Sequence, residues 1–280
     1  MTRTRILLLT SLAMIAFAGN SLLCRAALKG PSIDAASFTS IRLVSGALTL
    51  WLVVRVFGNT TPGRGNWPSA LALFAYAILF SFSYSGLTAA TGALILFTSV
   101  QATMIGYGLW AGERLSRWQI VGLGVAVAGL IGLLIPGLAA PPVINALLMV
   151  GAGVAWGVYS LRGKTAGDPT KVTAGNFLRA AVIAVLASFA AGKTASLTSA
   201  GVLYAVASGA LASGVGYAIW YAALPSLRAT SAAVVQLSVP AIAALGGALL
   251  LRELITVRLL LASLAILGGI ALVVTVKGRK

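Results

Sequence analysis

Histidine is absent from the sequence, cysteine occurs once, and aspartate and glutamate together occur four times. A single cysteine, Cys24, cannot form a disulfide bond within the chain, and without histidine the usual Cys/His metal sites are excluded. The sequence also has no paired carboxylates for acid–base catalysis and no glycine loop followed by lysine for phosphate binding. We therefore expect a protein that is not an enzyme and that needs neither a cofactor nor a metal.

Charged residues make up only 9% of the 280 residues, whereas 59% are hydrophobic. Soluble domains carry about 25% charged residues, so this chain has too little polar surface to cover itself in water. The 20 lysines and arginines give a net charge of +16. They occur in small groups between apolar runs, which is typical of the loops of membrane proteins and not of a nucleic-acid-binding patch. We expect contacts with membrane lipid and a small-molecule substrate, no nucleic acid, and a monomer.

Apolar runs of about 20 residues cross a membrane as helices, because an open sheet leaves backbone groups unpaired in lipid. The first run resembles a signal peptide, with Arg3 and Arg5 before an apolar core. A lipoprotein cleavage before Cys24 is the alternative, but bulky Leu22 and Leu23 stand where small residues are needed, so we expect an uncleaved span. Ten runs predict an all-α membrane protein with spans at residues 6–28, 34–57, 68–87, 91–111, 117–136, 142–162, 171–191, 200–222, 230–251 and 256–276.

The positive residues predict the orientation of these spans, because lysine and arginine accumulate in cytoplasmic loops. Of the 20, five fall at the outer ends of the spans if the N-terminus is inside, two lie within spans, and the other thirteen fall at the inner ends. The outer five are Arg25, Lys29, Lys193, Arg252 and Arg258, and the two within spans are Arg42 and Arg179. This asymmetry predicts that both termini are cytoplasmic.

Three stretches of the first half recur in the same order in the second half. They are AFAGNSLLCR (16–25) with AWGVYSLRGK (155–164), FTSIRLVSGAL (38–48) with GNFLRAAVIAV (175–185), and LWAGERLSRWQIVGLG (109–124) with LLLRELITVRLLLASL (249–264). Each half has five spans, an odd number, so the second copy enters the membrane from the opposite side. We expect two inverted five-helix repeats, residues 1–137 and 138–280, an architecture typical of secondary transporters whose substrate site lies near the midplane.

An arginine early in the second span of each half, together with GERLS (112–116) and RELIT (252–256), resembles the EamA-type repeat of the drug/metabolite transporter superfamily. The resemblance covers nearly the whole chain. Within the superfamily the chain looks most like the exporters of aromatic amino acids in the bacterial inner membrane. The resemblance implies a multi-pass protein of that membrane that exports aromatic or apolar amino acids and related metabolites by alternating access. One departure is Val100-Gln101, where the family often has proline and the second half has Pro240.

The four acids all lie at span ends or in connections: Asp34, Glu113, Asp168 and Glu253. Proton-driven carriers usually need a titratable group deep in the membrane. Its absence favours facilitated export, with proton coupling through Glu113 or Glu253 as the alternative. We expect these two acids to pair with nearby cations such as Arg114 or Arg252.

Polar and aromatic residues within the spans are the candidates for a substrate cavity. Aromatic walls provide apolar contact area, and their polar groups orient a ligand. The candidates are Asn20, Tyr76, Tyr84, Gln101, Trp156, Tyr159, Tyr217, Trp220 and Gln236. Asn20 and Tyr159 occupy equivalent positions of the two repeats. Individual tyrosines and tryptophans also occur at membrane interfaces, so only part of the set is expected to line the cavity.

Arg42 lies two turns into its span, about 12 Å deep, and is the candidate cation for attracting carboxylate-bearing solutes. A structural role, in which it bonds helix-end carbonyls, is the alternative reading, and the same holds for Arg179. Pro240 removes a backbone hydrogen bond in the middle of the ninth span and predicts a kink, which serves either as a hinge or as a static bend.

Two other functions remain open at this point. A drug or nucleotide-sugar carrier of the same superfamily would need a cavity acid or several cavity cations, respectively, and the sequence offers little of either. A membrane accessory protein without transport activity is the alternative outside transport.

Overall fold

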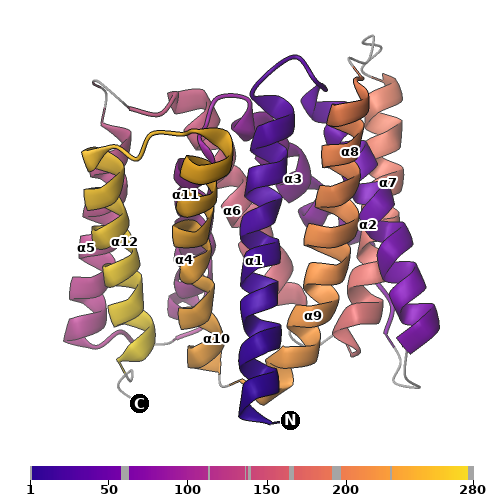
Figure 1. The fold of residues 1–280 in the computed structure, drawn as a ribbon. Helices are drawn as coiled ribbons and strands as arrows, with labels where there is room; N and C mark the ends of the chain where they lie inside the picture. Colours follow the sequence, from indigo (N-terminus) through magenta and orange to yellow (C-terminus); the bar gives the residue numbers. More distant parts are fainter. Residues whose placement is uncertain are drawn as a thin grey trace.

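The computed structural model describes residues 2–57, 63–112, 114–135, 137, 140–163, 167–190, 197–227 and 229–276. In these ranges the regular secondary structure is helical, apart from isolated bridges between Ile33 and Leu197 and between Gly63 and Gly167. Ten helices among the described residues are long and apolar enough to cross a membrane. They stand side by side as one bundle (Figure 1). The prediction of ten spans is confirmed.

Each of the first seven spans is a single helix. They are α1 (Arg3–Leu28), α2 (Ala35–Phe57), α3 (Trp67–Tyr84), α4 (Ala89–Trp110), α5 (Arg117–Leu134), α6 (Val143–Gly163) and α7 (Pro169–Ala190). The eighth span, Ser199–Ser226, joins α8 (Ser199–Ala207), the π-helical segment η1 (Ser208–Val215), α9 (Gly216–Ala223) and the short η2 (Leu224–Ser226). The ninth contains α10 (Ala229–Gln236) and α11 (Ser238–Leu251), and the tenth is α12 (Val257–Thr275).

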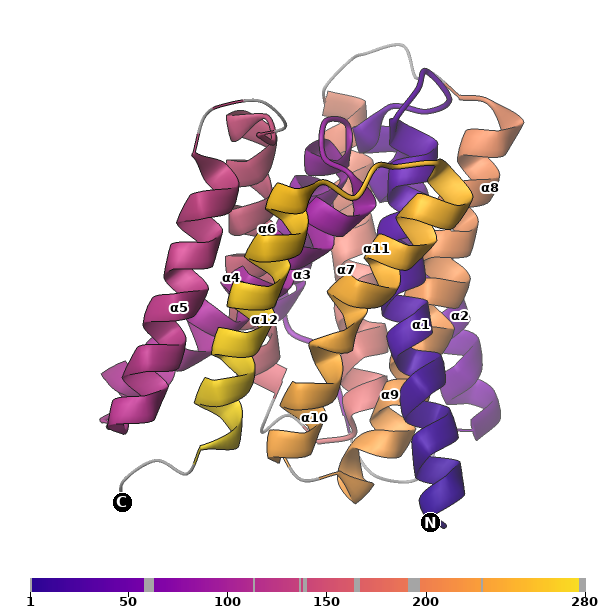
Figure 2. The same ribbon diagram turned by 60° about the vertical axis from the view of Figure 1, so that its left-hand side comes forward.

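The helix packing repeats between the two halves of the chain. Helix α3 packs on α6 while the eighth span packs on α1, and α4 packs on α6 while α11 packs on α1. Helices α2 and α7 pack on each other, as do α5 and α12, which form a pair at one edge of the bundle (Figure 2). Exchanging each helix for its counterpart five spans away therefore preserves the contacts. This is the pattern of two inverted five-helix repeats.

The chain begins and ends its bundle at the same end, where α1 starts and α12 stops (Figure 1). We call this end the inner end, because more of the described lysines and arginines lie there than at the opposite, outer end. At the inner end are Arg3, Arg5, Arg55, Arg64, Arg114, Arg117, Arg162 and Lys171, and at the outer end are Arg25, Lys29, Arg252 and Arg258.

Two of the acids are caps of equivalent helices. Asp34 Oδ1 accepts hydrogen bonds from the backbone N–H groups of Ala36 (3.1 Å) and Ser37 (2.9 Å) at the start of α2. Asp168 Oδ1 accepts from the corresponding two N–H groups at the start of α7, at 2.9 and 3.0 Å. Burial raises the pKa of Asp34, but the hydrogen bonds outweigh this effect, so the pKa lies below its ordinary value. These carboxylates cap the starts of α2 and α7.

The ninth span is interrupted at Leu237, between α10 and α11. Pro240 follows three residues later and is buried. Because proline has no N–H, it cannot bond the carbonyl of Gln236 one turn earlier, and its ring crowds that carbonyl. The break that Pro240 predicts is therefore present, and its use as a moving hinge stays a prediction.

The π-helical segment η1 lies unusually close to α2. A side chain at Gly209 would collide with Ser45 Oγ and with the backbone carbonyl of Arg42. A side chain at Gly46 would come within 2.7 Å of the Phe177 ring. Glycine at these points is what allows the backbones of the two halves to touch, as small residues do between membrane helices.

Candidate functional site

A cavity of about 500 Å³ lies inside the bundle, between the two repeats. Side chains from α1, α3, α4, α6, α7, the eighth span and α10 line it. Its volume is in the range of small-molecule sites. The lining reaches the inner end at Ser69, Gly163, Pro169 and Leu224, and it includes no described residue from the outer ends of the helices.

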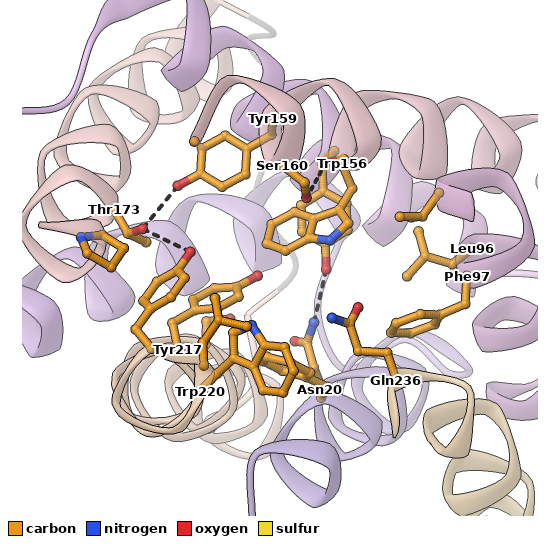
Figure 3. A pocket seen from close by; sticks show the side chains of 18 of the residues that line it. Asn20, Leu96, Phe97, Trp156, Tyr159, Ser160, Thr173, Tyr217, Trp220 and Gln236 are labelled. Carbon is orange, nitrogen blue, oxygen red and sulfur yellow. Dashed lines mark hydrogen bonds between the residues drawn. The ribbon is translucent and has the colours of Figure 1, made fainter. Parts of the chain in front are cut away.

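The cavity brings together eight of the ten side chains that the sequence analysis proposes for substrate binding. They are Asn20, Tyr76, Gln101, Trp156, Tyr159, Tyr217, Trp220 and Gln236. Most of them surround the open space in Figure 3. Asn20 and Tyr159, from equivalent positions of α1 and α6, both line it. Their contact with a substrate stays a prediction.

Tyr84 does not line the cavity. It is fully buried near the outer end of α3, its ring packs edge-on against Phe80 at 4.8 Å, and its hydroxyl donates to the backbone carbonyl of Ala89 at 3.4 Å. Its position explains the difference, because the last residue of α3 lies at the outer end of the bundle, beyond the cavity.

Arg42 also lies outside the lining, directly behind it. Its side chain is 1% exposed. The guanidinium packs over the rings of Tyr76 (5.3 Å) and Phe80 (4.8 Å), both of which line the cavity. Arg42 Nη2 donates to Tyr76 Oη at 3.1 Å, whereas Nε and Nη1 have no partner among the described residues. The sequence predicts that Arg42 contacts the cavity directly, and this is wrong: the rings of Tyr76 and Phe80 lie between its guanidinium and the cavity.

Arg179, the counterpart of Arg42 in α7, has a different environment. It donates to the carbonyl of Gly175 at 2.8 Å and lies 5.8 Å from the Trp67 ring. Its side chain is half-buried and does not line the cavity. For this residue the structural role is the one observed.

A polar cluster occupies the α1 side of the cavity. Asn20 Nδ2 donates to Tyr76 Oη at 3.3 Å, and Asn20 Oδ1 accepts from Ser208 Oγ at 2.7 Å. Together with the bond from Arg42, the Tyr76 oxygen accepts two hydrogen bonds. The phenol of Tyr76 in α3 is thus bonded to side chains of α1 and α2, and Asn20 connects it to Ser208 of the second repeat.

Aromatic rings form the wall that adjoins this cluster. Trp156 stacks on Tyr217 with ring centroids 5.4 Å apart, and it contacts Tyr76 at 4.8 Å and Tyr159 at 5.2 Å. Trp220, in α9, also lines the cavity (Figure 3). This arrangement offers an extended apolar surface that suits a flat or apolar side chain.

A second polar chain, of which only Tyr159 was expected from the sequence, lies in this wall. Asn176 Nδ2 donates to Tyr159 Oη (3.4 Å), which donates to Thr173 Oγ1 (3.3 Å), which in turn donates to Tyr221 Oη (3.2 Å). All four line the cavity. One signal was available: Asn176 stands in the repeated stretch GNFLRAAVIAV (175–185), one turn before Arg179.

Acidic groups are absent from the described lining of the cavity. Among the described residues there is also no cluster of histidine, cysteine, aspartate and glutamate that could hold a metal ion. Glu113, a candidate for proton coupling, lies outside the described residues. Two cations lie directly behind described lining residues: Arg42, which packs over Tyr76 and Phe80, and Arg162, whose Nε donates to Ser69 Oγ at 3.2 Å near the inner end.

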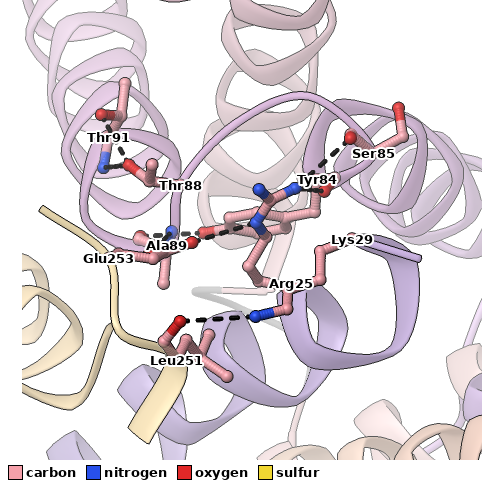
Figure 4. A network of polar contacts seen from close by, with 9 residues as sticks. All are labelled: Arg25, Lys29, Tyr84, Ser85, Thr88, Ala89, Thr91, Leu251 and Glu253. Carbon is pink, nitrogen blue, oxygen red and sulfur yellow. Dashed lines mark hydrogen bonds and ion pairs between the residues drawn. The ribbon is translucent and has the colours of Figure 1, made fainter. Parts of the chain in front are cut away.

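An ion-pair network lies at the outer end of the bundle (Figure 4). It consists of Arg25, Tyr84, Ser85, Ala89 and Glu253. Arg25 Nε and Glu253 Oε1 are 3.0 Å apart. Arg25 Nη1 donates to the carbonyls of Tyr84 (2.9 Å) and Ser85 (3.3 Å), and Glu253 Oε2 accepts from the N–H of Ala89 at 2.8 Å. The network joins α1, the α3–α4 turn and the segment after α11.

The pairing of Glu253 corrects an expectation from the sequence. Its ionic partner is Arg25, 228 residues away, and not the adjacent Arg252. Arg252 has φ of +55°, in the left-handed region, at the end of α11. This turn directs the chain so that the next side chain, Glu253, reaches α1.

Comparisons with known proteins agree with this architecture. The profile of the EamA-like transporter family matches residues 4–135 and 143–275. An uncharacterised protein of Pseudomonas aeruginosa is 56% identical over 270 residues, which are 96% of this chain and 94% of that protein. An uncharacterised transporter of Archaeoglobus fulgidus is 28% identical over 262 residues, 88% of this chain and 89% of that one. A crystal structure with 19% identity superimposes with a TM-score of 0.66 over 97% of this chain and 98% of its own, which shows the same fold.

Proposed function

The chain belongs to the EamA-like transporter family, and on that premise we propose that it is a secondary transporter that exports aromatic and apolar amino acids by alternating access. The observation that carries the proposal is the cavity: an aromatic wall and a polar cluster adjoin each other around a space of about 500 Å³. An amino acid has the same two parts, an apolar side chain and a polar head. That the direction is export rests on the family resemblance.

The shape of the cavity supports alternating access. Its lining reaches the inner end, whereas at the outer end the ion-pair network holds three segments of the chain together. This is the geometry of one access state, in which a substrate enters from the inner side. With the termini in the cytoplasm, as the positive charges favour, that side is the cytoplasm of a bacterium and the membrane is the inner one. We propose that a monomer carries out the cycle.

The mode of transport that fits the described cavity is facilitated. A proton-coupled carrier places a titratable group on the substrate path, and two described acids are helix caps while Glu253 is in an ion pair. Substrate would thus move down its own gradient. A pH gradient across proteoliposomes should leave the initial rate of export unchanged.

The test of the function is counterflow in proteoliposomes that contain only this protein, run over the twenty amino acids. We expect exchange of phenylalanine, tyrosine, tryptophan and large aliphatic amino acids, and reduced exchange in Tyr159→Ala and Asn20→Ala. Tyr107→Ala, which removes an exposed tyrosine of α4 outside the cavity, is the matched control. Purified protein that exchanges no amino acid would contradict the proposal, and exchange of cationic drugs alone would favour the drug-exporter alternative.

A further inference from the structure

We propose that the cavity recognises the carboxylate of its substrate at Tyr76 and Asn20, with the buried charge of Arg42 acting from behind Tyr76, and that the amino group of the substrate is not needed for binding. The inference rests on the proposed function, because it concerns the same cavity. It extends that function by naming the chemical group that is recognised and the residues that recognise it. The substrate class becomes apolar or aromatic carboxylates, of which amino acids are one part.

The first argument is the hydrogen bonding of the Tyr76 hydroxyl. A phenol oxygen has two acceptor positions and one hydrogen to donate. Both acceptor positions are used, by Arg42 Nη2 at 3.1 Å and by Asn20 Nδ2 at 3.3 Å. No described residue accepts the Tyr76 hydrogen, and the ring lines the cavity. The hydrogen is therefore available to an acceptor on a ligand.

The second argument is the uncompensated charge of Arg42. Its side chain is 1% exposed, and Nε and Nη1 have no hydrogen-bond partner among the described residues. The acid at the start of its own helix, Asp34, is held by two backbone N–H groups. A buried charge without a counter-ion is unfavourable, and an anion nearby relieves it. A carboxylate bonded to the Tyr76 hydroxyl would stand on the far side of that phenol, within reach of the field of Arg42.

The third argument is that nothing in the described lining complements an ammonium group by charge. No aspartate or glutamate lines the cavity. The neutral oxygen acceptors include the side-chain amides of Gln101 and Gln236, neither of which makes a hydrogen bond to another described residue. An amide oxygen accepts a hydrogen bond from a neutral donor as well as from a positively charged one, so these two residues do not require an ammonium group. Recognition by charge is thus directed at the carboxylate alone.

Three ligands that share a phenyl ring show whether the wild-type protein recognises the carboxylate or the amino group of its substrate. Binding of phenylalanine, 3-phenylpropanoate and 2-phenylethylamine to the purified protein in nanodiscs can be measured by calorimetry. We expect 3-phenylpropanoate to bind at least as tightly as phenylalanine, and 2-phenylethylamine to bind at least tenfold more weakly. Equal or tighter binding of the amine would overturn the carboxylate site while leaving the transport function intact. Absence of binding by all three would contradict the proposed function itself.

Two pairs of variants assign the site to its residues. Tyr76→Phe keeps the ring and removes the hydroxyl, and it should weaken 3-phenylpropanoate binding roughly ten- to hundredfold, the range for a hydrogen bond to a charged group. Tyr107→Phe, on the exposed side of α4, should bind as the wild type does. Wild-type affinity in a folded Tyr76→Phe protein would overturn the assignment.

Arg42→Gln tests the charge, with Arg179→Gln as its control at the corresponding position of α7. We expect Arg42→Gln to lose the preference for the carboxylate over the amine, and Arg179→Gln to retain it. An unchanged preference in Arg42→Gln would contradict a role of its charge. If Arg42→Gln does not fold, the ligand series in the wild type and Tyr76→Phe still decide the proposal.

Discussion

Removing the charge of Glu253 should open the outer end of the bundle. Glu253→Gln keeps a side chain of the same size and a neutral oxygen that can still accept from the N–H of Ala89. It removes the ionic attraction to Arg25 and leaves that arginine with its bonds to the α3–α4 turn. Because the network joins three segments that must separate in an outward-open state, its loss acts on the balance between the two access states.

The magnitude follows from the geometry of the pair. At 3.0 Å and an effective dielectric constant of about 20, the gross attraction is about 5 kcal/mol. The two side chains are 17% and 10% exposed, so desolvation offsets part of this gain, and breaking a buried pair costs about 3–5 kcal/mol. Allowing for the remaining hydrogen bond and the partial exposure, we expect about 2–3 kcal/mol. This corresponds to a shift of roughly 30- to 150-fold toward the outer-open state.

Cysteine accessibility from the outer side measures that shift. Ser21→Cys in a Cys24→Ala background places a single thiol at the part of the cavity lining nearest the outer end of α1. The rate of its modification by a membrane-impermeant maleimide, added outside, reports the outer-open population. We expect Glu253→Gln to raise this rate by the factor above. Modification at the wild-type rate would refute the view that the ion-pair network holds this end closed.

Lys29→Gln is the matched control for this experiment. Lys29 lies one turn after Arg25, is exposed, and donates only to the carbonyl of Leu251 at 3.4 Å. Exposed charges contribute about 0–1 kcal/mol, so its removal should change the rate of modification no more than a few-fold. A large increase in Lys29→Gln would show that general loss of positive charge, and not this pair, controls access.

Three further predictions concern the scaffold. Gly209→Val should destabilise the folded protein by several kcal/mol in thermal unfolding, since its side chain would collide with α2, whereas Gly19→Val, which has open space, should melt near the wild-type temperature. Asp34→Ala should lower the free energy of unfolding by about 1 kcal/mol. Because the pKa of this carboxylate is lowered from 3.8, its contribution to stability is present above pH 3.8 and is lost as the pH falls through the lowered pKa. The stabilities of the wild type and the variant should therefore converge in acid. Pro240→Ala restores an N–H to bond the Gln236 carbonyl and should slow counterflow with substrate affinity unchanged; unchanged flux would mark the break as static.

The fold was accessible from the sequence because the membrane imposes strong constraints on it. A helix must be about 20 residues long to cross, and short polar connections mark where each one stops. Even the narrow separation of the third and fourth spans was visible, since Thr88 stands there and is the N-cap of α4. The inverted repeat followed from an odd number of spans per copy and needed no structural information.

Most of the residue types that line the cavity could be predicted from the sequence, but the side chains that face it could not be predicted one by one. An uncharged polar residue such as Asn20 has few places to go in an apolar span other than the bundle interior. Which side of a helix meets the cavity is a different matter, because lipid-facing and core-facing sides are both apolar here. Arg42 and Tyr84 were therefore expected in the lining. Helix α2 contributes no described residue to the lining, so Arg42 lies behind it, and Tyr84 is on the same face of α3 as Tyr76 and Phe80 but lies beyond the cavity at the outer end of the helix.

Contacts between distant segments could not be predicted from local patterns. The bond between Arg25 and Glu253 spans 228 residues, and the sequence suggested a nearer partner for the acid. The π-helical segment η1 is likewise not encoded by any motif, since SGALASGV (208–215) reads as an ordinary small-residue membrane helix. Both features depend on how the second repeat packs on the first.

The central claim is that substrate passes through the cavity between the two repeats, and a thiol placed in that cavity tests it most directly. Ser160→Cys, in the Cys24→Ala background, puts the thiol on the cavity side of α6, and Val158→Cys puts one on its exposed side. After modification with a bulky maleimide, phenylalanine counterflow should stop in Ser160→Cys, excess phenylalanine should protect against the loss, and Val158→Cys should continue to exchange. Full exchange by completely modified Ser160→Cys protein would show that the substrate does not travel through this cavity.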